Sequence, residues 1–331
     1  MRISVLGAGS WGSALACAFS KIAPVLLWSR DQAQVFSIQT RRVNHGYLPD
    51  DVIFPDSITV TSDFSSACNT DLIVIATPLN AVREVLAAIS REAKEIPDII
   101  LVSKGFEANS GKLSHEIIHD VLPGFKRFGL LLGPSFAKEV ALELPTAITL
   151  AAFDLSFAIS WMQKLKGIPN FRIYAHDDII GSEVGSAVKN VLAIAVGISD
   201  GMQLGFNARA ALITRSLNEL AALVLALGGR RETIYGLTGI GDLILTCTGD
   251  LSRNRQVGLE LAKGKSIDAI VNELGHVAEG VLTAKEIHLK AQSLGIDMPI
   301  VASVYRIIYE NSDIKAEVVN LIARAQKTEF I

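Results

Sequence analysis

Short apolar segments alternate with longer amphipathic segments along the first half of the chain. The apolar segments lack the strict alternation of half-exposed strands, which is typical of strands covered on both faces of a parallel sheet. They lie at residues 3–6, 25–28, 72–76, 99–102, 130–132 and 147–150. The amphipathic segments at 13–22, 79–89 and 112–121 favour helices. This order predicts an α/β domain with a Rossmann-like, doubly wound sheet.

After about residue 180 the pattern changes to apolar residues at helical spacing. We expect helices over 184–196, 212–225, 277–294, 300–309 and 314–325, and no strand in this half. The chain therefore divides into a Rossmann-like domain over residues 1–180 and an all-helical domain over residues 181–331. Because ligands often bind between domains, we expect the functional site at this junction.

Composition agrees with a globular chain of two domains. The 331 residues are about twice the ~150 expected of one domain. Half of them (50%) are hydrophobic and 20% are charged, which excludes a disordered chain. The formal net charge of −3 excludes a generally basic nucleic-acid-binding protein but leaves room for a local basic pocket.

Cysteines and histidines do not indicate a disulfide or metal framework. Cys17, Cys68 and Cys247 are widely spaced, so we expect three buried thiols. His115 and His119 have the spacing of a zinc pair on a helix but lack a matching set of carboxylates, so we expect a solvated pair and no metal site.

Export and membrane-spanning segments are not expected either. The N-terminal apolar segment gives way to glycines at once, unlike a signal peptide. The longest uninterrupted apolar windows, 191–198 and 220–227, are far shorter than the ~20 residues of a membrane span. We therefore expect a cytoplasmic protein.

A glycine-rich turn follows the first predicted strand. Residues 7–12 read Gly-Ala-Gly-Ser-Trp-Gly, a GxGxxG pattern between a strand and a helix. In such a turn Gly7 makes the bend, Gly9 lets a pyrophosphate approach the backbone, and Gly12 lets the helix pack on the strand. Free N–H groups at the helix N-terminus then face the phosphates. The pattern predicts dinucleotide binding, and a bare structural turn is the alternative.

The end of the second predicted strand bears on the choice between NAD and NADP. An acid there accepts a hydrogen bond from the ribose 2′-hydroxyl of NAD, whereas an arginine pairs with the 2′-phosphate of NADP. The chain reads Ser29-Arg30-Asp31 at this point. We interpret Arg30 as a 2′-phosphate ligand, with NAD kept open by Asp31. The alternative is an ordinary surface arginine.

Two lysines lie where an anionic ligand would be bound. Lys104 follows the fourth predicted strand, and Gly133 and Ser135 follow the fifth, so all three lie at the ligand-binding edge of the sheet. Lys189 lies inside an apolar helix, one turn after Gly185, which makes room beside it. Burial lowers the pKa of a lysine toward values useful for proton transfer. The alternatives are a solvated loop lysine and a lysine that reaches solvent at the helix edge.

Two further polar segments follow in the helical half. Asp242 opens a predicted helix, where an acid can also be a simple cap. Ser252, Arg253 and Asn254 place hydrogen-bond donors side by side, as a phosphate requires. The alternative for this segment is a plain turn.

Together these motifs resemble those of a known family. Residues 7–12, 103–105, 133–137, 189–190, 241–242 and 252–254 occur in order along almost the whole chain. The set closely resembles the bacterial NAD(P)-dependent sn-glycerol-3-phosphate dehydrogenases. The resemblance implies an enzyme that interconverts sn-glycerol 3-phosphate and dihydroxyacetone phosphate and supplies glycerol 3-phosphate for phospholipid synthesis. The apolar helical half also favours a homodimer.

The resemblance implies roles for individual residues. Lys189 is the implied proton acceptor. The implied cofactor ligands, besides the three glycines, are Ser10, Trp11, Arg30, Lys104, Ala137, Arg253, Val277 and Glu279. The implied substrate ligands are Lys104, Gly133, Ser135, Lys189, Asp242, Ser252, Arg253 and Asn254. The first domain is then the NAD(P)-binding domain and the second the substrate-binding domain.

Two other functions are compatible with these residues. Other two-domain dehydrogenases also use a lysine and act on 3-hydroxy acids or ketopantoate, and a carboxylate substrate would place this chain among them. A dinucleotide sensor without activity would keep the fold alone. The partner expected here is a small phosphorylated substrate.

Overall fold

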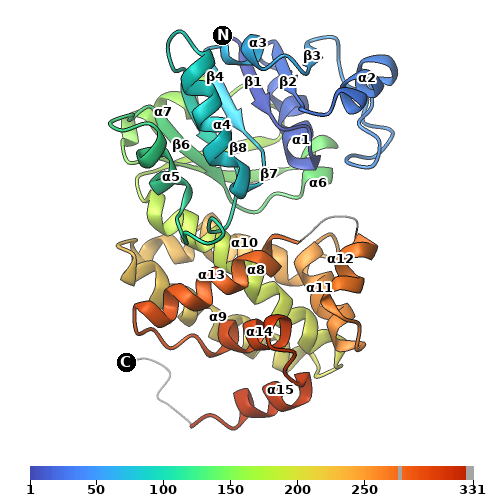
Figure 1. The fold of residues 1–331 in the computed structure, drawn as a ribbon, viewed down its shortest axis with the longest axis vertical. Helices are drawn as coiled ribbons and strands as arrows, with labels where there is room; N and C mark the ends of the chain where they lie inside the picture. The colour runs from blue at the N-terminus through green and yellow to red at the C-terminus, as the bar shows by residue number, and fades with distance from the viewer. Residues whose placement is uncertain (275–277, 326–331) are drawn as a thin grey trace.

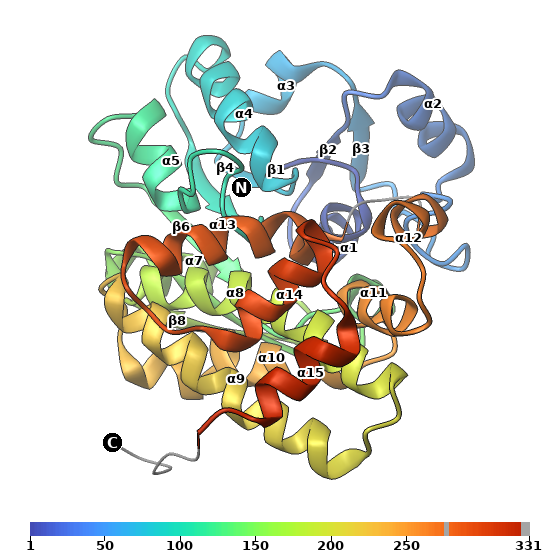
Figure 2. The same ribbon diagram turned by 60° about the horizontal axis from the view of Figure 1, so that its bottom comes forward.

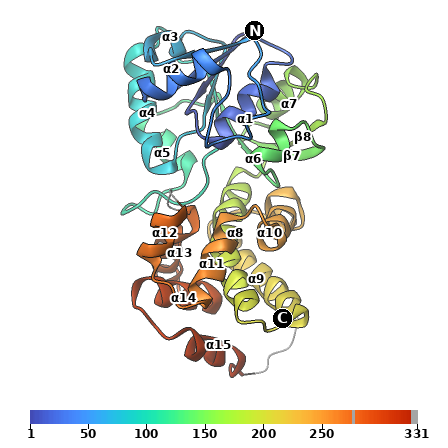
Figure 3. The ribbon, with the colours of Figure 1, turned by 90° about the vertical axis from the view of Figure 1, so that its right-hand side faces the viewer.

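The chain folds into two lobes stacked along the long axis of the molecule (Figures 1 and 3). The computed structural model describes residues 1–274 and 278–325. The strands all lie in the first lobe: β1 (Ile3–Leu6), β2 (Val25–Trp28), β3 (Ile58–Thr61), β4 (Leu72–Ile75), β5 (Asp98–Leu101), β6 (Phe128–Leu132), β7 (Thr146–Ala151) and β8 (Phe171–His176). The helices of this lobe are α1 (Ser10–Phe19), α2 (Gln32–Arg41), α3 (Phe64–Cys68), α4 (Leu79–Glu92), α5 (Ser114–Val121), α6 (Ala137–Ala141) and α7 (Leu155–Lys164).

The regular elements described in the second lobe are all helices. Its helices are α8 (Ile179–Gly201), α9 (Phe206–Ala226), α10 (Asp242–Thr248), α11 (Arg253–Ala262), α12 (Ile267–Leu274), α13 (Glu279–Ser293), α14 (Pro299–Tyr309) and α15 (Ile314–Ile322). Two short helical turns, η1 (Arg231–Tyr235) and η2 (Leu237–Gly241), precede α10. The all-helical character expected for this half is confirmed.

One sheet with the strand order β3-β2-β1-β4-β5-β6-β7-β8 forms the centre of the first lobe. Its neighbouring strands are parallel except β6 and β7, which pair antiparallel. One buried cluster packs α1, α2, α6 and α7 on one face, and another packs α3, α4 and α5 on the opposite face. The doubly wound, Rossmann-like fold expected from the uninterrupted apolar segments is therefore confirmed.

The two strands that the apolar pattern did not predict are the edge strands β3 and β8. In β3 the side chains of Ile58 and Val60 are buried, whereas Thr59 is exposed. In β8 only Phe171 is buried. An edge strand with one solvated face needs no continuous apolar run, so a search for such runs passes over it.

Helix α8 is the core of the second lobe. It follows β8 after two residues and is surrounded by α9, α10, α11, α13 and α14 (Figure 2). Two glycines allow α8 and α11 to approach closely. A Cβ on Gly197 would lie 2.1 Å from Arg255 O, and a Cβ on Gly258 would lie 2.1 Å from Ile194 O.

By length and composition alone, α8 could cross a membrane. Its 23 residues include an 18-residue window of mean hydropathy 1.5. That window is 94% buried inside the protein, as in the core helix of a folded domain. Small and polar residues interrupt the apolar ones in α8, so a search for uninterrupted apolar windows finds only its segment 191–198.

Candidate active site

The glycine-rich turn has the geometry that its three glycines predict. Gly7 has φ +117°, and a Cβ there would lie 2.8 Å from Ala76 O. A Cβ on Gly12 would lie 1.9 Å from Gly7 O, so a side chain would push α1 away from the sheet. A Cβ on Gly9 would meet no atom within 4 Å. The turn is therefore closed at Gly7 and Gly12 and open at Gly9.

The surroundings of this turn fit a polar ligand. Ser10 begins α1, and no side chain caps the helix N-terminus. The Nε1 atom of Trp11 and the Oγ1 atom of Thr77 are buried without a hydrogen-bond partner in the described structure. Buried polar atoms are rarely left unpaired, so a ligand that supplies partners is expected here. Together with the open face of Gly9, this fits a dinucleotide phosphate group.

The tip of β2 presents an arginine, while the neighbouring acid is engaged elsewhere. Arg30 is exposed and makes no hydrogen bond or ion pair with any residue that the structure describes. The Asp31 carboxylate caps α2 by accepting from Ala33 N at 2.9 Å. Asp31 is therefore directed at its own helix, and a role of Arg30 toward a 2′-phosphate stays a prediction.

Two lysines from different lobes meet on one buried carboxylate. Lys104 Nζ donates to Asp242 Oδ2 at 3.0 Å and lies 3.4 Å from Gly133 O. Lys189 Nζ donates to the other oxygen, Asp242 Oδ1, and to Thr246 Oγ1 at 2.9 Å. Asp242 is 1% exposed and Lys189 5% exposed. The structure thus brings together three residues that lie far apart in the sequence.

Local backbone features place these groups. Lys104 and Gly133 follow the carboxyl ends of β5 and β6, which are parallel neighbours. A Cβ on Gly185 would lie 2.4 Å from Thr238 O, so this glycine lets α8 pack against the segment before α10. The room predicted beside Lys189 is therefore filled by backbone. That contact brings Lys189, one turn later, onto Asp242.

Burial dominates the acid–base chemistry of Lys189. It lowers the pKa of the ammonium group, the Asp242 carboxylate raises this pKa, and the positive charge of Lys104 lowers it, so that the resulting pKa is about 8. An amine with such a pKa exchanges a proton near neutral pH. The prediction of a buried lysine rather than a snorkelling one is confirmed. Asp242 is not a simple helix cap. No side chain caps α10, and the carboxylate of Asp242 faces the two lysines instead.

A second polar cluster joins α8, α11 and α13 beside the lysines. Asn254 Nδ2 donates to Asn190 Oδ1 at 3.0 Å, and Gly280 N donates to Asn254 Oδ1 at 3.0 Å. Asn190 Nδ2 lies 3.4 Å from Glu279 Oε2. Asn190 directly follows Lys189, so this cluster adjoins the lysine pair. Ser252 caps α11 by accepting from the backbone N–H three residues later, so this segment is a helix start.

The remaining predicted site residues have fewer side-chain contacts than the lysine pair. Ser135 Oγ donates to Gly133 O at 3.1 Å, next to Lys104. Ala137 is the first residue of α6, which packs on α1. Arg253 begins α11, is exposed, and has no side-chain partner among the described residues. Val277 lies outside the described residues.

Sequence reasoning assigned no role to Thr246, which contacts Lys189 directly. Thr246 Oγ1 also donates to Asp242 O at 2.6 Å, so the hydroxyl joins the two charged residues. The available signal was its spacing, one helical turn after Asp242. The asparagine after Lys189 was part of the resemblance, but its link to Asn254 becomes visible only in three dimensions.

His115 belongs to neither a metal site nor a solvated pair. Its backbone N–H donates to Glu183 Oε1 at 3.2 Å, and its Nδ1 pairs with Glu183 Oε2. This places a contact between α5 of the first lobe and α8 of the second. In residues 1–274 and 278–325, no group of three or more His, Cys, Asp or Glu is arranged to hold a metal. All three cysteines are free and buried, as expected.

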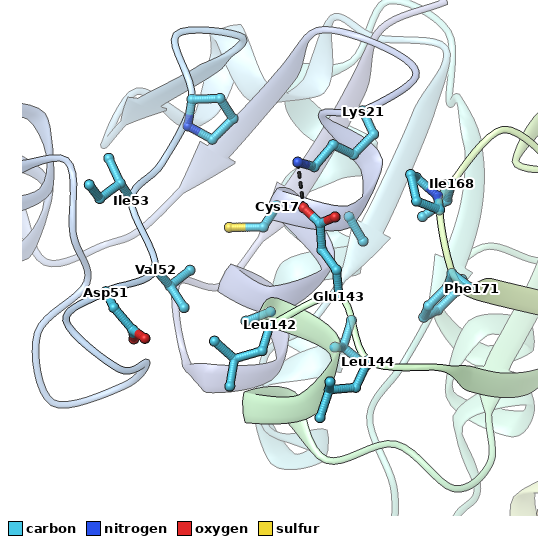
Figure 4. A pocket seen from close by; sticks show the side chains of 15 residues that line it. Cys17, Lys21, Asp51, Val52, Ile53, Leu142, Glu143, Leu144, Ile168 and Phe171 are labelled. Atoms are coloured by element: carbon cyan, nitrogen blue, oxygen red, sulfur yellow. Dashed lines mark ion pairs between the residues drawn. The ribbon is translucent and has the colours of Figure 1, made fainter.

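A cavity of about 260 Å³ lies apart from these clusters, between α1 and α6 (Figure 4). Apolar side chains such as Val52 and Leu142 line it, and Lys21 Nζ pairs with Glu143 Oε1 there at 2.5 Å. Burial raises the pKa of the Cys17 thiol beside it to about 12, which makes the thiol a poor nucleophile. The predicted site residues are absent from its described lining.

Comparisons with known proteins cover the whole chain. Residues 2–158 match the family model of the NAD-dependent glycerol-3-phosphate dehydrogenase N-terminus, and residues 178–319 match that of the C-terminus. A glycerol-3-phosphate dehydrogenase (NAD(P)+) of Aromatoleum aromaticum is 50% identical over 99% of this chain and 100% of that protein. One from Thiobacillus denitrificans is 48% identical over 100% of both.

A solved structure agrees with these sequence matches. The crystal structure of glycerol-3-phosphate dehydrogenase from Coxiella burnetii superposes with a TM-score of 0.92 at 40% identity. The match covers 98% of this chain and 99% of that one. Both family models, the full-length relatives and the fold therefore lead to one assignment. The chain belongs to the NAD-dependent glycerol-3-phosphate dehydrogenase family.

Proposed function

We propose that the chain catalyses the NAD(P)-dependent interconversion of sn-glycerol 3-phosphate and dihydroxyacetone phosphate. The observation that carries the proposal is the meeting of Lys104 and Lys189 on the buried Asp242. A lysine whose pKa is about 8 suits the removal of a proton from a secondary hydroxyl. The open glycine-rich turn on the same sheet supports the use of a dinucleotide.

Lys189 is the proposed base and acid of the reaction. As a neutral amine, Lys189 Nζ takes the proton of the C2 hydroxyl while the C2 hydride leaves. In reverse, the ammonium returns a proton to the carbonyl oxygen of dihydroxyacetone phosphate. Lys104 keeps the pKa of Lys189 down through like-charge repulsion and polarises the substrate oxygen. The nicotinamide, when bound, exchanges the hydride with the substrate carbon.

The substrate phosphate needs donors that these lysines do not supply. We propose that Ser252, Arg253 and Asn254 at the start of α11 provide them, since Arg253 is exposed and free of partners within the described residues. A guanidinium matches two phosphate oxygens at once. Gly133 and Ser135 would hold the glycerol end beside Lys104.

The dinucleotide would lie along the carboxyl edge of the sheet. We propose that Gly7 to Gly12 hold the pyrophosphate, that Arg30 holds the 2′-phosphate of NADP, and that Ala137 and Glu279 contact the cofactor further along. Lys104 and Arg253 would contact both ligands. Residues 1–180 then form the cofactor-binding domain and residues 181–331 the substrate-binding domain. We further propose a cytoplasmic homodimer that supplies glycerol 3-phosphate for phospholipid synthesis.

Steady-state kinetics with Lys189→Met tests this function. The wild type should oxidise NADPH and NADH with dihydroxyacetone phosphate and leave 3-oxo acids and ketopantoate unreacted. Lys189→Met keeps the side-chain length but cannot carry a proton, so kcat should fall by about 10²- to 10⁴-fold while the Kd for NADPH is kept. The exposed Lys166 offers a control, and Lys166→Met should behave like the wild type.

Two outcomes would overturn the proposed reaction, and a third would overturn the role of Lys189. Turnover of an oxo acid in place of dihydroxyacetone phosphate would make the chain a hydroxy-acid dehydrogenase. Binding of NADPH without turnover of any substrate would make it a sensor. If Lys189→Met kept the wild-type kcat, the proton would have to be carried by another group.

A further inference from the structure

A hydrogen-bonded network centred on Gln34 and Asn44 fixes the peptide between Ala8 and Gly9. The carbonyl oxygen of Ala8 accepts from Gln34 Nε2 at 2.8 Å and from Asn44 Nδ2 at 2.8 Å. Gln34 lies in α2, and Asn44 lies in the segment that follows this helix. Two side chains distant in sequence thus converge on one carbonyl of the glycine-rich turn.

The backbone N–H of Asp31 determines which atom donates and which accepts in each hydrogen bond of this network. Asp31 N donates to Ser29 Oγ at 3.2 Å, and Ser29 Oγ donates to Gln34 Oε1 at 2.7 Å. The Gln34 amide therefore turns its nitrogen toward Ala8 and toward Asn44 Oδ1, which lies 3.2 Å away. Since all these groups are paired, the amide of Gln34 has one orientation.

Asn44 closes the network from the other side. Its Nδ2 donates to Ser13 Oγ of α1 at 2.7 Å as well as to Ala8. With Oδ1 accepting from Gln34, the amide of Asn44 also has a fixed orientation. Asn44 is 2% exposed, so these bonds are shielded from water. The network therefore ties the turn, α1 and the tip of β2 together.

The fixed carbonyl determines where the next N–H points. In a planar trans peptide the carbonyl of Ala8 and the N–H of Gly9 point in opposite directions. Glycine has no Cβ, so local sterics at residue 9 do little to prevent this peptide from flipping. A flip would turn a carbonyl oxygen, with its partial negative charge, toward the side where a phosphate is expected. The two amide donors oppose that flip.

We propose that Gln34 and Asn44 are positioning residues for the dinucleotide phosphates. They hold the Ala8 carbonyl away from the ligand and so keep the Gly9 N–H directed at it, without touching the cofactor themselves. This inference rests on the proposed function only in requiring that a dinucleotide binds at the turn. Their loss should weaken binding of NADPH and NADH alike, because both carry the pyrophosphate.

The variant Gln34→Met tests the proposal at one donor. Methionine has a similar length and no N–H, so Ala8 O loses one hydrogen bond. The Kd and the KM for NADPH and NADH should rise about fivefold, the loss expected for one such bond. The kcat and the KM for dihydroxyacetone phosphate should change less than about twofold, since the substrate residues are untouched.

Gln39→Met provides the matched control on the same helix. Gln39 Nε2 donates to Val60 O at 2.8 Å, so its replacement also removes one amide-to-carbonyl bond, but at β3 instead of the turn. The control should leave the Kd for both dinucleotides unchanged. Thermal unfolding of all variants separates a loss of stability from a loss of positioning.

Asn44→Asp tests the other donor. A carboxylate of the same size cannot donate to Ala8 O and repels it, so the Kd for both dinucleotides should rise about tenfold or more. If Gln34→Met and Asn44→Asp both bind the dinucleotides as tightly as Gln39→Met, the inference is wrong while the proposed function stands. If the wild type binds neither NADPH nor NADH, both are wrong.

Discussion

Asp242 acts on two lysines whose charges also act on each other. It attracts both ammonium groups. The unfavourable free energy of burying the Lys189 ammonium is nevertheless larger than the favourable attraction to Asp242, so the pKa of Lys189 falls to about 8. The pKa of Lys189 therefore depends on two charged neighbours with opposite effects. Asp242 keeps the ammonium of Lys189 charged, and Lys104 favours its neutral form. Each neighbour can be removed separately.

The pH profile of glycerol 3-phosphate oxidation should report this balance. Lys189 must be neutral to accept a proton, so kcat/KM should rise with pH and level off above about 8. Asp242→Asn removes the charge that raises the pKa of Lys189 and should move the midpoint to lower pH. Lys104→Met removes the charge that lowers this pKa and should move the midpoint to higher pH.

These shifts are independent of how much rate each variant loses. Both residues also serve the proposed substrate site, so lower rates are expected for both. Opposite displacement of the two midpoints distinguishes an effect on Lys189 from a general loss of activity. Midpoints that move in the same direction, or a profile unchanged by both substitutions, would contradict the assignment of the titrating group to Lys189.

Among the helices, α9 and α14 are joined by a buried carboxylate. Glu219 of α9 accepts from Ile300 N at 2.6 Å and from Val301 N at 3.1 Å, in the first turn of α14. Burial raises the pKa of Glu219 to about 7, although the two N–H donors act to lower it. The removal of the carboxylate from water therefore outweighs its hydrogen bonds.

This carboxyl group should make stability depend on pH. Its pKa is about 7 in the folded protein against 4.5 as reference, so the folded state holds the proton more tightly. Stability should thus fall as pH rises from about 4.5 to above 7, by up to about 3 kcal/mol. In Glu219→Gln the side chain at this position does not titrate. Its free energy of unfolding relative to the wild type should rise between pH 5 and pH 8 in urea titrations.

The exposed Glu84 of α4 supplies the comparison. Glu84→Gln should follow the pH dependence of the wild type across the same range. A Glu219→Gln variant whose stability difference from the wild type is constant between pH 5 and pH 8 would show that Glu219 does not titrate in this window.

Elements differ in how far the sequence predicts them. The buried strands from β1 to β7, apart from β3, were found because both of their faces are apolar. The edge strands β3 and β8 were missed because one face is solvated. Helix α1 begins at Ser10, three residues before the predicted start, because the glycine-rich turn itself contributes its first residues. Periodicity could not reveal this start, since Ser10 and Gly12 carry no apolar signal.

The candidate site was predicted in its residues but not in its contacts. Motifs and resemblance indicated Lys104, Lys189 and Asp242, yet no spacing shows that one carboxylate serves both lysines. That contact depends on how the two lobes pack, a property of the whole molecule. Gln34 and Asn44 were not predicted, because a polar residue in the first turn of a helix or in the segment after it is ordinary in sequence.

The homodimer proposed above can be tested at the scale of the whole molecule. The proposal places the interface on the apolar helical lobe, where Phe206 at the start of α9 is 79% exposed. Light scattering should give twice the monomer mass. Phe206→Ser should weaken the dimer, whereas Ile53→Ser, at a 69% exposed position of the first lobe, should not.

A monomer mass at all protein concentrations would contradict the dimer. Equal weakening by both substitutions would show that the interface is not confined to the helical lobe.

The burial of α8 has a consequence for the order in which the chain is synthesised. All strands of the sheet precede α8, so the first lobe can fold while the ribosome is still adding residues. The partners of α8 extend to Tyr309 at the end of α14, and about 110 residues separate this position from Gly201. At a synthesis rate of roughly 5–20 residues per second, several seconds pass before the last partners of α8 have been synthesised. During this time an apolar helix with the length of a membrane span lacks part of the surface that buries it. The helix that carries Lys189 is thus also a segment of the nascent chain that needs protection from aggregation.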